Sequence, residues 1–269
     1  MRHSLALFLL LTLTACNLFA PLPDGSAPTV SLPVEQMYEN AMDEMNDGNY
    51  EKAVKAFESL QSHYPYGRYA QQAQLEIAYS YFKQKEPDAA LSAVDRFIKQ
   101  YPNNPHVDYA YYLKGLINFN EDLGLFGSII QPDLSDRDPQ AARDAFDAFK
   151  ELVTRFPESK YADDSRLRMQ YLINTLARHE IHVADYYWHR GAYVAAVNRA
   201  KEVLANYPQT PATRDALGIM VKSYDAMGMS KLRDDTQRVL DMNSAKGGTS
   251  AAGMTSSPQE RKSWWQFWK

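Results

Sequence analysis

The sequence predicts an all-α protein, a solenoid of about five helix–turn–helix units, and three observations carry that prediction. An aromatic–proline pair recurs along the chain, an alanine stands twelve residues before each of these prolines, and apolar residues follow each alanine at helical spacing. The chain has 269 residues, of which 45% are apolar and 23% charged. A chain of this length and composition can bury a sizeable core.

The prolines set the register of the repeat, because proline cannot continue a helix. They occur in the pairs Tyr64-Pro65, Tyr101-Pro102, Phe156-Pro157 and Tyr207-Pro208. The alanines twelve residues earlier are Ala53, Ala90, Ala145 and Ala196. Another twelve residues back, on the preceding helical segments, stand Ala41, Ala78 and Ala184. Small residues at these paired places let two antiparallel helices approach closely. The pattern resembles the tetratricopeptide repeat of about 34 residues; an unrelated helical bundle with recurrent proline stops is the alternative.

The units differ in their turns and lengths. In the first and fourth units Gly48 and Gly191 supply the turn, and a tyrosine begins the second helix. The third and fourth units carry about 20 residues more than the repeat requires. The segment 162–190 contains no Gly or Pro and predicts one overlong helix. The segment 121–136 predicts a loop packed by its own side chains, with a partner-contacting loop as the alternative, and 211–243 predicts a degenerate fifth unit.

The first 15 residues predict an export signal, because the apolar run 5–13 is far too short to span a bilayer. The run ends in Leu13-Thr14-Ala15-Cys16, which resembles the bacterial lipobox. Cys16, the single cysteine of the chain, is then expected to carry diacylglycerol and an N-acyl chain; a plain signal with an incidental cysteine is the alternative. Residues 16–33 predict a proline-rich tether, and Asn17 after the cysteine favours the outer membrane.

The net charge and the side-chain patterns of the chain argue against several classes of function. With 29 basic and 33 acidic residues the net charge is −4, so a nucleic-acid partner is not expected. The histidines His179, His182 and His189 lack the spacing of a zinc protease helix, and no metal or other cofactor is predicted. No pattern in the sequence argues for catalysis. The sequence therefore predicts a non-enzymatic binding protein.

Aromatic residues are the best candidates for binding. Tyrosines and phenylalanines gather on the first helices of the second and third units, where they predict either an amphipathic groove or repeat core: Tyr79, Tyr81, Phe82, Tyr109, Tyr111 and Tyr112. The tail 244–269 predicts disorder and carries an aromatic cluster at Trp264, Trp265, Phe267 and Trp268. Either a binding role or a dispensable extension fits this cluster.

Four separated segments, together with the lipobox, resemble the BamD (ComL) family, lipoproteins of the outer-membrane β-barrel assembly (BAM) machinery. They are Tyr64–Gln72, Ser135–Gln140, Arg190–Arg199 and Ala212–Leu217. The resemblance implies five tetratricopeptide repeats anchored by lipid on the periplasmic face of the outer membrane. As partners it implies the POTRA domains of a BamA-like barrel protein, other BAM lipoproteins and unfolded outer-membrane proteins.

The same resemblance implies roles for particular residues. Arg190, Arg199 and Asp215 are expected to contact the BamA-like partner. Tyr64, Tyr66 and Tyr69 are expected to contact the unfolded substrate. A Tol-Pal-associated or other envelope repeat scaffold is the alternative, but it would carry an ordinary cleaved signal and an N-terminal coiled coil.

Overall fold

The computed structural model describes residues 32–123 and 139–246. Cys16, residues 1–31 of the predicted signal and tether, residues 124–136 of the predicted loop and the aromatic cluster of the tail lie outside the described residues.

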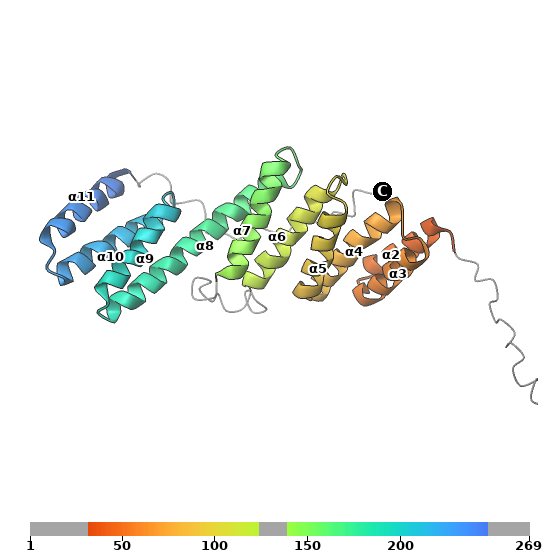
Figure 1. Cartoon of the computed structure of the whole chain (residues 1–269), viewed down its shortest axis with the longest axis horizontal. Coiled ribbons are helices and arrows are strands. Elements are labelled where there is room, and N and C mark those ends of the chain that lie inside the picture. The colour runs from red at the N-terminus through yellow and green to blue at the C-terminus, as the bar shows by residue number, and fades with distance from the viewer. Residues whose placement is uncertain (1–31, 124–138, 247–269) are drawn as a thin grey trace, which may run out of the picture.

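The described residues form ten α-helices and no strand, which stand side by side in an elongated row (Figure 1). Their bounds are α2 Val34–Asn46, α3 Tyr50–His63, α4 Arg68–Gln84, α5 Pro87–Gln100, α6 Val107–Leu123, α7 Gln140–Arg155, α8 Ala162–His189, α9 Tyr193–Asn206, α10 Ala212–Ala226 and α11 Ser230–Lys246. Each helix packs on the next, and α2 with α4, α4 with α6 and α8 with α10 also meet. The predicted all-α repeat solenoid is confirmed.

Local sequence explains the helix ends. Gly48 and Gly191 follow α2 and α8 with φ angles of 80° and 74°, a conformation that glycine adopts without steric cost. The helix α3 ends before Pro65, and the amide of Tyr64 donates to the Leu60 carbonyl at 2.8 Å. The seven alanines of the repeat register are fully buried: Ala41, Ala53, Ala78, Ala90, Ala145, Ala184 and Ala196.

The apolar core has two parts that meet within α8. The first part runs from α2 to Leu176, and the second runs from Ala177 to α10. Helix α8 has 28 residues, whereas the first helices of the other units have 13 to 17, so it alone extends through both parts (Figure 1). The predicted overlong helix is therefore present, and it joins the two halves of the row.

The tyrosines of the first helices are mainly core residues. Tyr79, Tyr109 and Tyr112 are buried, so the interpretation of these rings as an exposed groove is wrong. The side chains of Tyr81, Phe82 and Tyr111 are half-buried and pack against the same core. A tyrosine can be buried when its hydroxyl finds a partner, as that of Tyr112 does by donating to Asp164 Oδ2 at 2.7 Å.

Among the described residues, no helix combines the length and the apolar character needed to cross a membrane.

Candidate partner-binding site

The buried face of α8 carries charged residues at core positions. Buried residues recur at every fourth position along this helix: Asp164, Arg168, Leu172, Leu176, Glu180 and Ala184. Because a buried charge is costly unless it is paired, each charged member of this series needs a partner on a neighbouring helix or on α8 itself.

Asp164 and Arg168 form an ion pair within the first part of the core. The Arg168 Nε atom donates to Asp164 Oδ2 at 2.6 Å, and both side chains are almost fully buried. The Tyr112 hydroxyl donates to the same oxygen, and the guanidinium of Arg168 lies 4.9 Å from the centre of the Phe119 ring. This pair joins α6 to α8 and is a structural element of the core.

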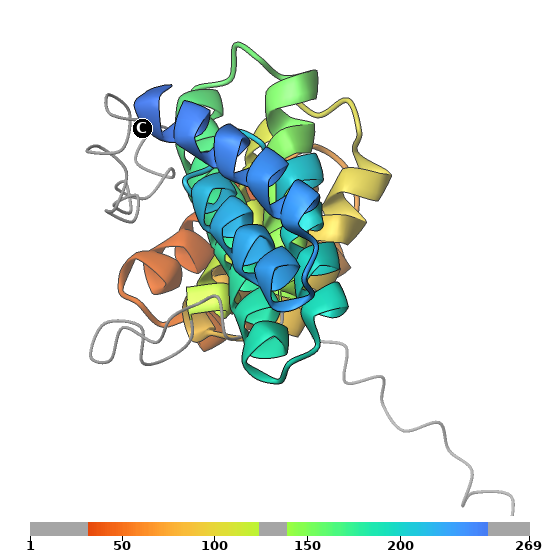
Figure 2. The same cartoon turned by 90° about the vertical axis from the view of Figure 1, so that its left-hand side faces the viewer.

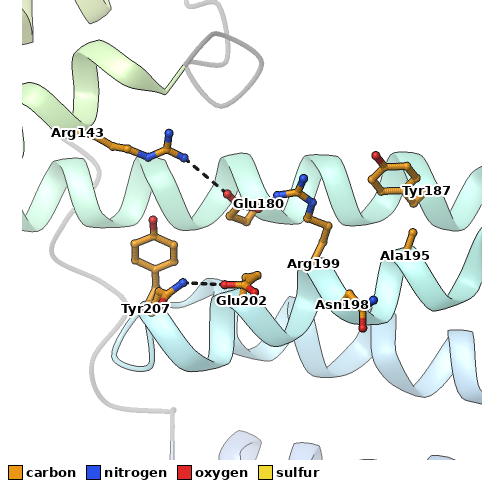
Figure 3. Close-up of a pocket in the computed structure, with 9 residues that line it drawn as sticks. Arg143, Glu180, Tyr187, Ala195, Asn198, Arg199, Glu202 and Tyr207 are labelled. Carbon is orange, nitrogen blue, oxygen red and sulfur yellow. Dashed lines mark hydrogen bonds and ion pairs between the residues drawn. The ribbon is translucent and has the colours of Figure 1, made fainter.

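Glu180 finds its partners on two different helices. Arg199 of α9 approaches its Oε2 atom at 3.3 Å, and Arg143 of α7 approaches its Oε1 atom at 3.9 Å. The Glu180 side chain is 10% exposed, whereas the two arginine side chains are 46% and 45% exposed. Arg143, near the start of α7, and Arg199, on α9, therefore meet at Glu180 over the middle of α8 (Figure 3). Glu180 lies four residues after Leu176, the last residue of the first part of the core.

An open groove of about 600 Å³ lies over this cluster. Besides Arg143, Glu180 and Arg199 it is lined by Tyr187, Ala195, Asn198, Glu202, Asn206 and Tyr207 (Figure 3). The Asn206 amide donates to Glu202 at 2.9 Å. Burial raises the pKa of the Tyr207 phenol above its usual value, while Arg143 acts in the opposite direction. The phenol is thus neutral at physiological pH and remains a hydrogen-bond donor.

The lining suits a polar segment of another protein. The two half-exposed guanidinium groups donate hydrogen bonds to carboxylates or carbonyl oxygens, and the amides both donate and accept. Glu180 and Glu202 balance the arginine charges, so the groove is polar without a strong net charge. Such a surface gives specificity by matching individual groups.

The three residues expected to contact the BamA-like partner do not form one patch. Arg199 lines the groove. Arg190 caps the C-terminal end of α8, with its guanidinium 5.3 Å from the centre of the Tyr186 ring. Asp215 is exposed in the first turn of α10. Arg190 precedes α9 and Asp215 lies in the first turn of the helix that follows it, so these two residues lie near opposite ends of α9, a helix about 20 Å long.

The three tyrosines expected to contact substrate surround the α3–α4 connection. The Tyr64 hydroxyl donates to the Leu32 carbonyl at 3.0 Å. The Tyr69 ring packs 5.3 Å from that of Tyr38, and its hydroxyl accepts from Arg68 at 2.9 Å. The Tyr66 side chain is 89% exposed. Of these three, Tyr66 therefore presents the most accessible ring to a partner.

The histidines of α8 lie outside the groove lining. His189 Nδ1 lies 2.9 Å from the Asp185 carbonyl and 3.1 Å from its carboxylate. Within the described ranges 32–123 and 139–246, no three His, Cys, Asp or Glu side chains are grouped so that they could hold a metal ion.

Sequence reasoning missed Glu180 and Arg143 as members of the site. A signal for Glu180 was present, because this acidic residue stands four residues after Leu176 and four before Ala184, in phase with the buried face. A second acidic residue, Glu76 of α4, was missed in the same way and is fully buried.

Glu76 lies in the first part of the core and accepts a long hydrogen bond of 3.5 Å from the Tyr38 hydroxyl at its Oε1 atom. Its Oε2 atom has no hydrogen-bond partner among the described residues. Burial raises the pKa of this carboxyl well above its ordinary value. The carboxyl is consequently held in its neutral form more strongly than an exposed glutamate.

The fold and the groove define the class of this molecule, an α-helical repeat protein of the tetratricopeptide type with a polar groove at the junction of its two core parts.

The family model described as "Outer membrane lipoprotein" matches residues 31–240. The outer membrane protein assembly factor BamD of Neisseria meningitidis serogroup B is 42% identical over 258 residues, which cover 96% of each chain. The BamD of Vibrio cholerae serotype O1 is 34% identical over 221 residues, covering 81% of this chain and 92% of the relative. Among solved structures, that of the MamA protein covers 82% of this chain at 14% identity, with a TM-score of 0.34.

The chain belongs to the BamD family of outer-membrane lipoproteins. It is an outer-membrane protein assembly factor and part of the BAM machinery. The alternative prediction, a Tol-Pal-associated scaffold, finds no support among these relatives.

Proposed function

We propose that the chain is a non-catalytic scaffold that holds a POTRA domain of a BamA-like barrel protein in the groove over the middle of α8. The observation that carries this proposal is the arrangement of Arg143 and Arg199 around Glu180. Each guanidinium is anchored by Glu180 and still about half exposed, so each has donors left for a partner. Because Glu180 fixes the arginines before binding, less side-chain entropy is lost when the partner docks.

Arg190 and Asp215 complete the proposed contact surface at its two ends. Since they lie near opposite ends of α9, a partner that touches both must extend along that helix for about 20 Å. A folded domain such as a POTRA module is large enough to do so, and a short peptide bound only in the groove is not.

The N-terminal units, in the same proposal, receive unfolded outer-membrane proteins. Tyr66 supports this role because its ring is exposed to solvent in the connection between α3 and α4. An exposed aromatic ring with a polar hydroxyl suits a strand that alternates aromatic and polar residues. Tyr64 and Tyr69 hold the connection in place, through Leu32 and Tyr38 respectively.

The anchor in this proposal is the lipid on Cys16, which holds the repeats at the periplasmic face of the outer membrane beside other BAM lipoproteins. Acyl chains contribute about 0.8 kcal/mol per buried methylene, so two or more give lasting attachment. Replacement of Cys16 by alanine should move the protein from the membrane fraction to the soluble fraction when its partner is depleted. Retention in the membrane under these conditions would contradict the anchor.

Affinity purification from gently solubilised membranes tests the docking proposal. The full-length protein should recover a barrel protein that carries POTRA domains, and the Arg199→Glu variant should recover at least tenfold less. Arg166→Glu serves as the matched control, because Arg166 is also about half exposed on α8 but pairs with Asp163 far from the groove. Equal recovery with all three proteins would count against the groove as the docking site.

A further inference from the structure

The two halves of the row are joined through one helix. The first half comprises α2–α7 with α8 up to Leu176, and the second half comprises α8 from Ala177 onward with α9–α11. Among the described helices, only α8 packs on helices of both halves. Figure 1 shows α9–α11 on one side of this junction, and Figure 2, which looks onto that end of the row, shows α11 as the outermost helix. A change in the angle between the halves therefore has to take place within α8.

The turn of α8 that precedes the junction carries a feature that favours bending. The hydroxyl of Thr175, a residue that is 2% exposed, donates to the Tyr171 carbonyl at 3.1 Å. In a regular helix this carbonyl accepts only from the backbone amide of residue 175, and a second donor from a threonine slightly weakens the helix and often bends it. Thr175 stands two residues before Ala177, where the second part of the core begins. The weakened turn and the junction of the two core parts therefore coincide.

Two side-chain contacts outside the α8 backbone cross the same junction. Tyr207, at the C-terminal end of α9, packs against both parts of the core, and no other half-buried apolar side chain of the described residues does so. Arg143 of the first half approaches Glu180 of the second half at 3.9 Å. An ion pair this long with a half-exposed arginine is weak. These contacts hold the halves together loosely, so the angle depends on whatever else touches both sides.

The groove proposed as the docking site lies over this junction. Its lining combines Arg143 from the first half with Arg199 and Tyr207 from the second (Figure 3). We propose that the row bends at residues 171–177 of α8 and that a partner docked in the groove holds the two halves at one angle. The bending is a property of the unbound chain, whereas its arrest by a partner rests on the docking proposed above.

Arrest of the bending gives the docking site a regulatory role. A partner that contacts Arg143 and Arg199 together binds best at the angle that brings both arginines within reach. Binding and angle are therefore linked, and any change that fixes this angle raises the affinity for the partner. The connection around Tyr66, proposed to receive unfolded proteins, belongs to the first half, so the angle also sets its distance from the docked domain.

Spin labels on introduced cysteines measure the bending in the full-length protein. Lys150→Cys on α7 and Lys231→Cys on α11 report across the junction, and Lys83→Cys on α4 with Lys150→Cys reports within the first half; all three lysines are exposed. The protein with Cys16 alone supplies the background. Double electron–electron resonance should give a distance distribution at least twice as wide across the junction as within the first half. Equal widths would overturn the bending.

Two variants locate the bend. Thr175→Val removes the hydroxyl that donates to Tyr171, so the distribution across the junction should become narrower. Tyr207→Ala removes the ring that contacts both core parts, so the distribution should become wider. Tyr101→Ala is the matched control, because Tyr101 occupies the same place in the second unit and packs within the first part of the core alone. Equal widening by Tyr101→Ala and Tyr207→Ala, with no narrowing by Thr175→Val, would refute the assignment of the bend to this junction.

Purified POTRA domains of the BamA-like barrel protein test the arrest. At saturating concentration they should narrow the distribution across the junction about twofold and leave the distribution within the first half unchanged. Binding without narrowing would overturn the arrest and leave the docking proposal intact. Failure of the domains to bind would contradict the docking proposal and the arrest together, while the widths measured in the unbound protein would still decide the bending.

Discussion

Arg199 and Glu180 join α9 to α8 at 3.3 Å, at the junction where the two parts of the core meet. Arg143 reaches the same carboxylate from α7 at 3.9 Å. A single acidic side chain therefore connects three helices and both halves of the row. Its arginines also line the groove proposed as the docking site, so the proposal assigns both stability and binding to the same residues.

Replacement of Arg199 by alanine should lower the free energy of unfolding by about 1–2 kcal/mol, because the nearly buried Glu180 carboxylate loses its closer partner. The second partner, Arg143, limits the loss. Urea denaturation of Arg199→Ala, Glu180→Ala and the double variant measures the coupling between the two residues. We expect a coupling of about 1 kcal/mol, and strictly additive losses would show that the contact does not contribute.

Replacement of Asp164 by asparagine should cost more, about 3–5 kcal/mol, because it leaves the buried Arg168 guanidinium without its counter-charge. Thermal unfolding followed by circular dichroism measures the loss. Asp163→Asn is the matched control one residue away, where the exposed carboxylate pairs with Arg166 on the surface. A loss in the control as large as that in Asp164→Asn would refute the assignment of Asp164 to the core.

Two helical glycines should respond in opposite directions to alanine. At Gly115 of α6 a new Cβ atom would collide with the ring of Phe149, so Gly115→Ala should destabilise the protein by about 1–3 kcal/mol. At Gly218 of α10 no atom lies within 4 Å of the new Cβ, so Gly218→Ala should stabilise it by up to about 1 kcal/mol. Denaturation midpoints of the two variants check this pair of predictions, and a shift of the same sign in both would contradict the packing of α6 on α7.

The buried carboxyl of Glu76 should make stability fall as pH rises. Because its pKa is raised in the folded state, the folded protein keeps a proton that the unfolded chain releases above about pH 4.5. From there up to the folded pKa, this group lowers the free energy of unfolding by at most about 1.4 kcal/mol per pH unit. Glu76→Gln removes the titration, so the slope between pH 5 and pH 8 should be smaller in this variant. Identical slopes in urea unfolding would contradict a protonated Glu76.

The helices were predictable because their signals are local. A proline ends a helix, a glycine allows the turn, and two alanines twelve residues apart mark where two helices touch; each of these signals acts within one helix–turn–helix unit. The overlong helix was predictable for the same reason, since 162–189 contains no helix breaker. Once the ends of the helices are known, the lengths of the units and the order of the helices can be read from the sequence.

The candidate site was predictable only in part, because it depends on contacts between distant segments. Arg199 was selected from the family resemblance and does line the groove, but Glu180 and Arg143 belong to it only because α7 and α9 meet over α8. The separation of Arg190 from Asp215 by the length of α9 is likewise a property of the fold. Tyr79, Tyr109 and Tyr112 were ambiguous because a tyrosine suits both a buried core and an exposed groove.

Site-specific photocrosslinking at Asn198 tests the central claim, docking of a POTRA domain in the groove, most directly. Asn198 is exposed, lines the groove and precedes Arg199, so a crosslinker there should capture the BamA-like barrel protein in intact cells. The same crosslinker at Leu167, exposed on the other half of α8, should give little of this product. Capture at Leu167 but not at Asn198 would contradict the account.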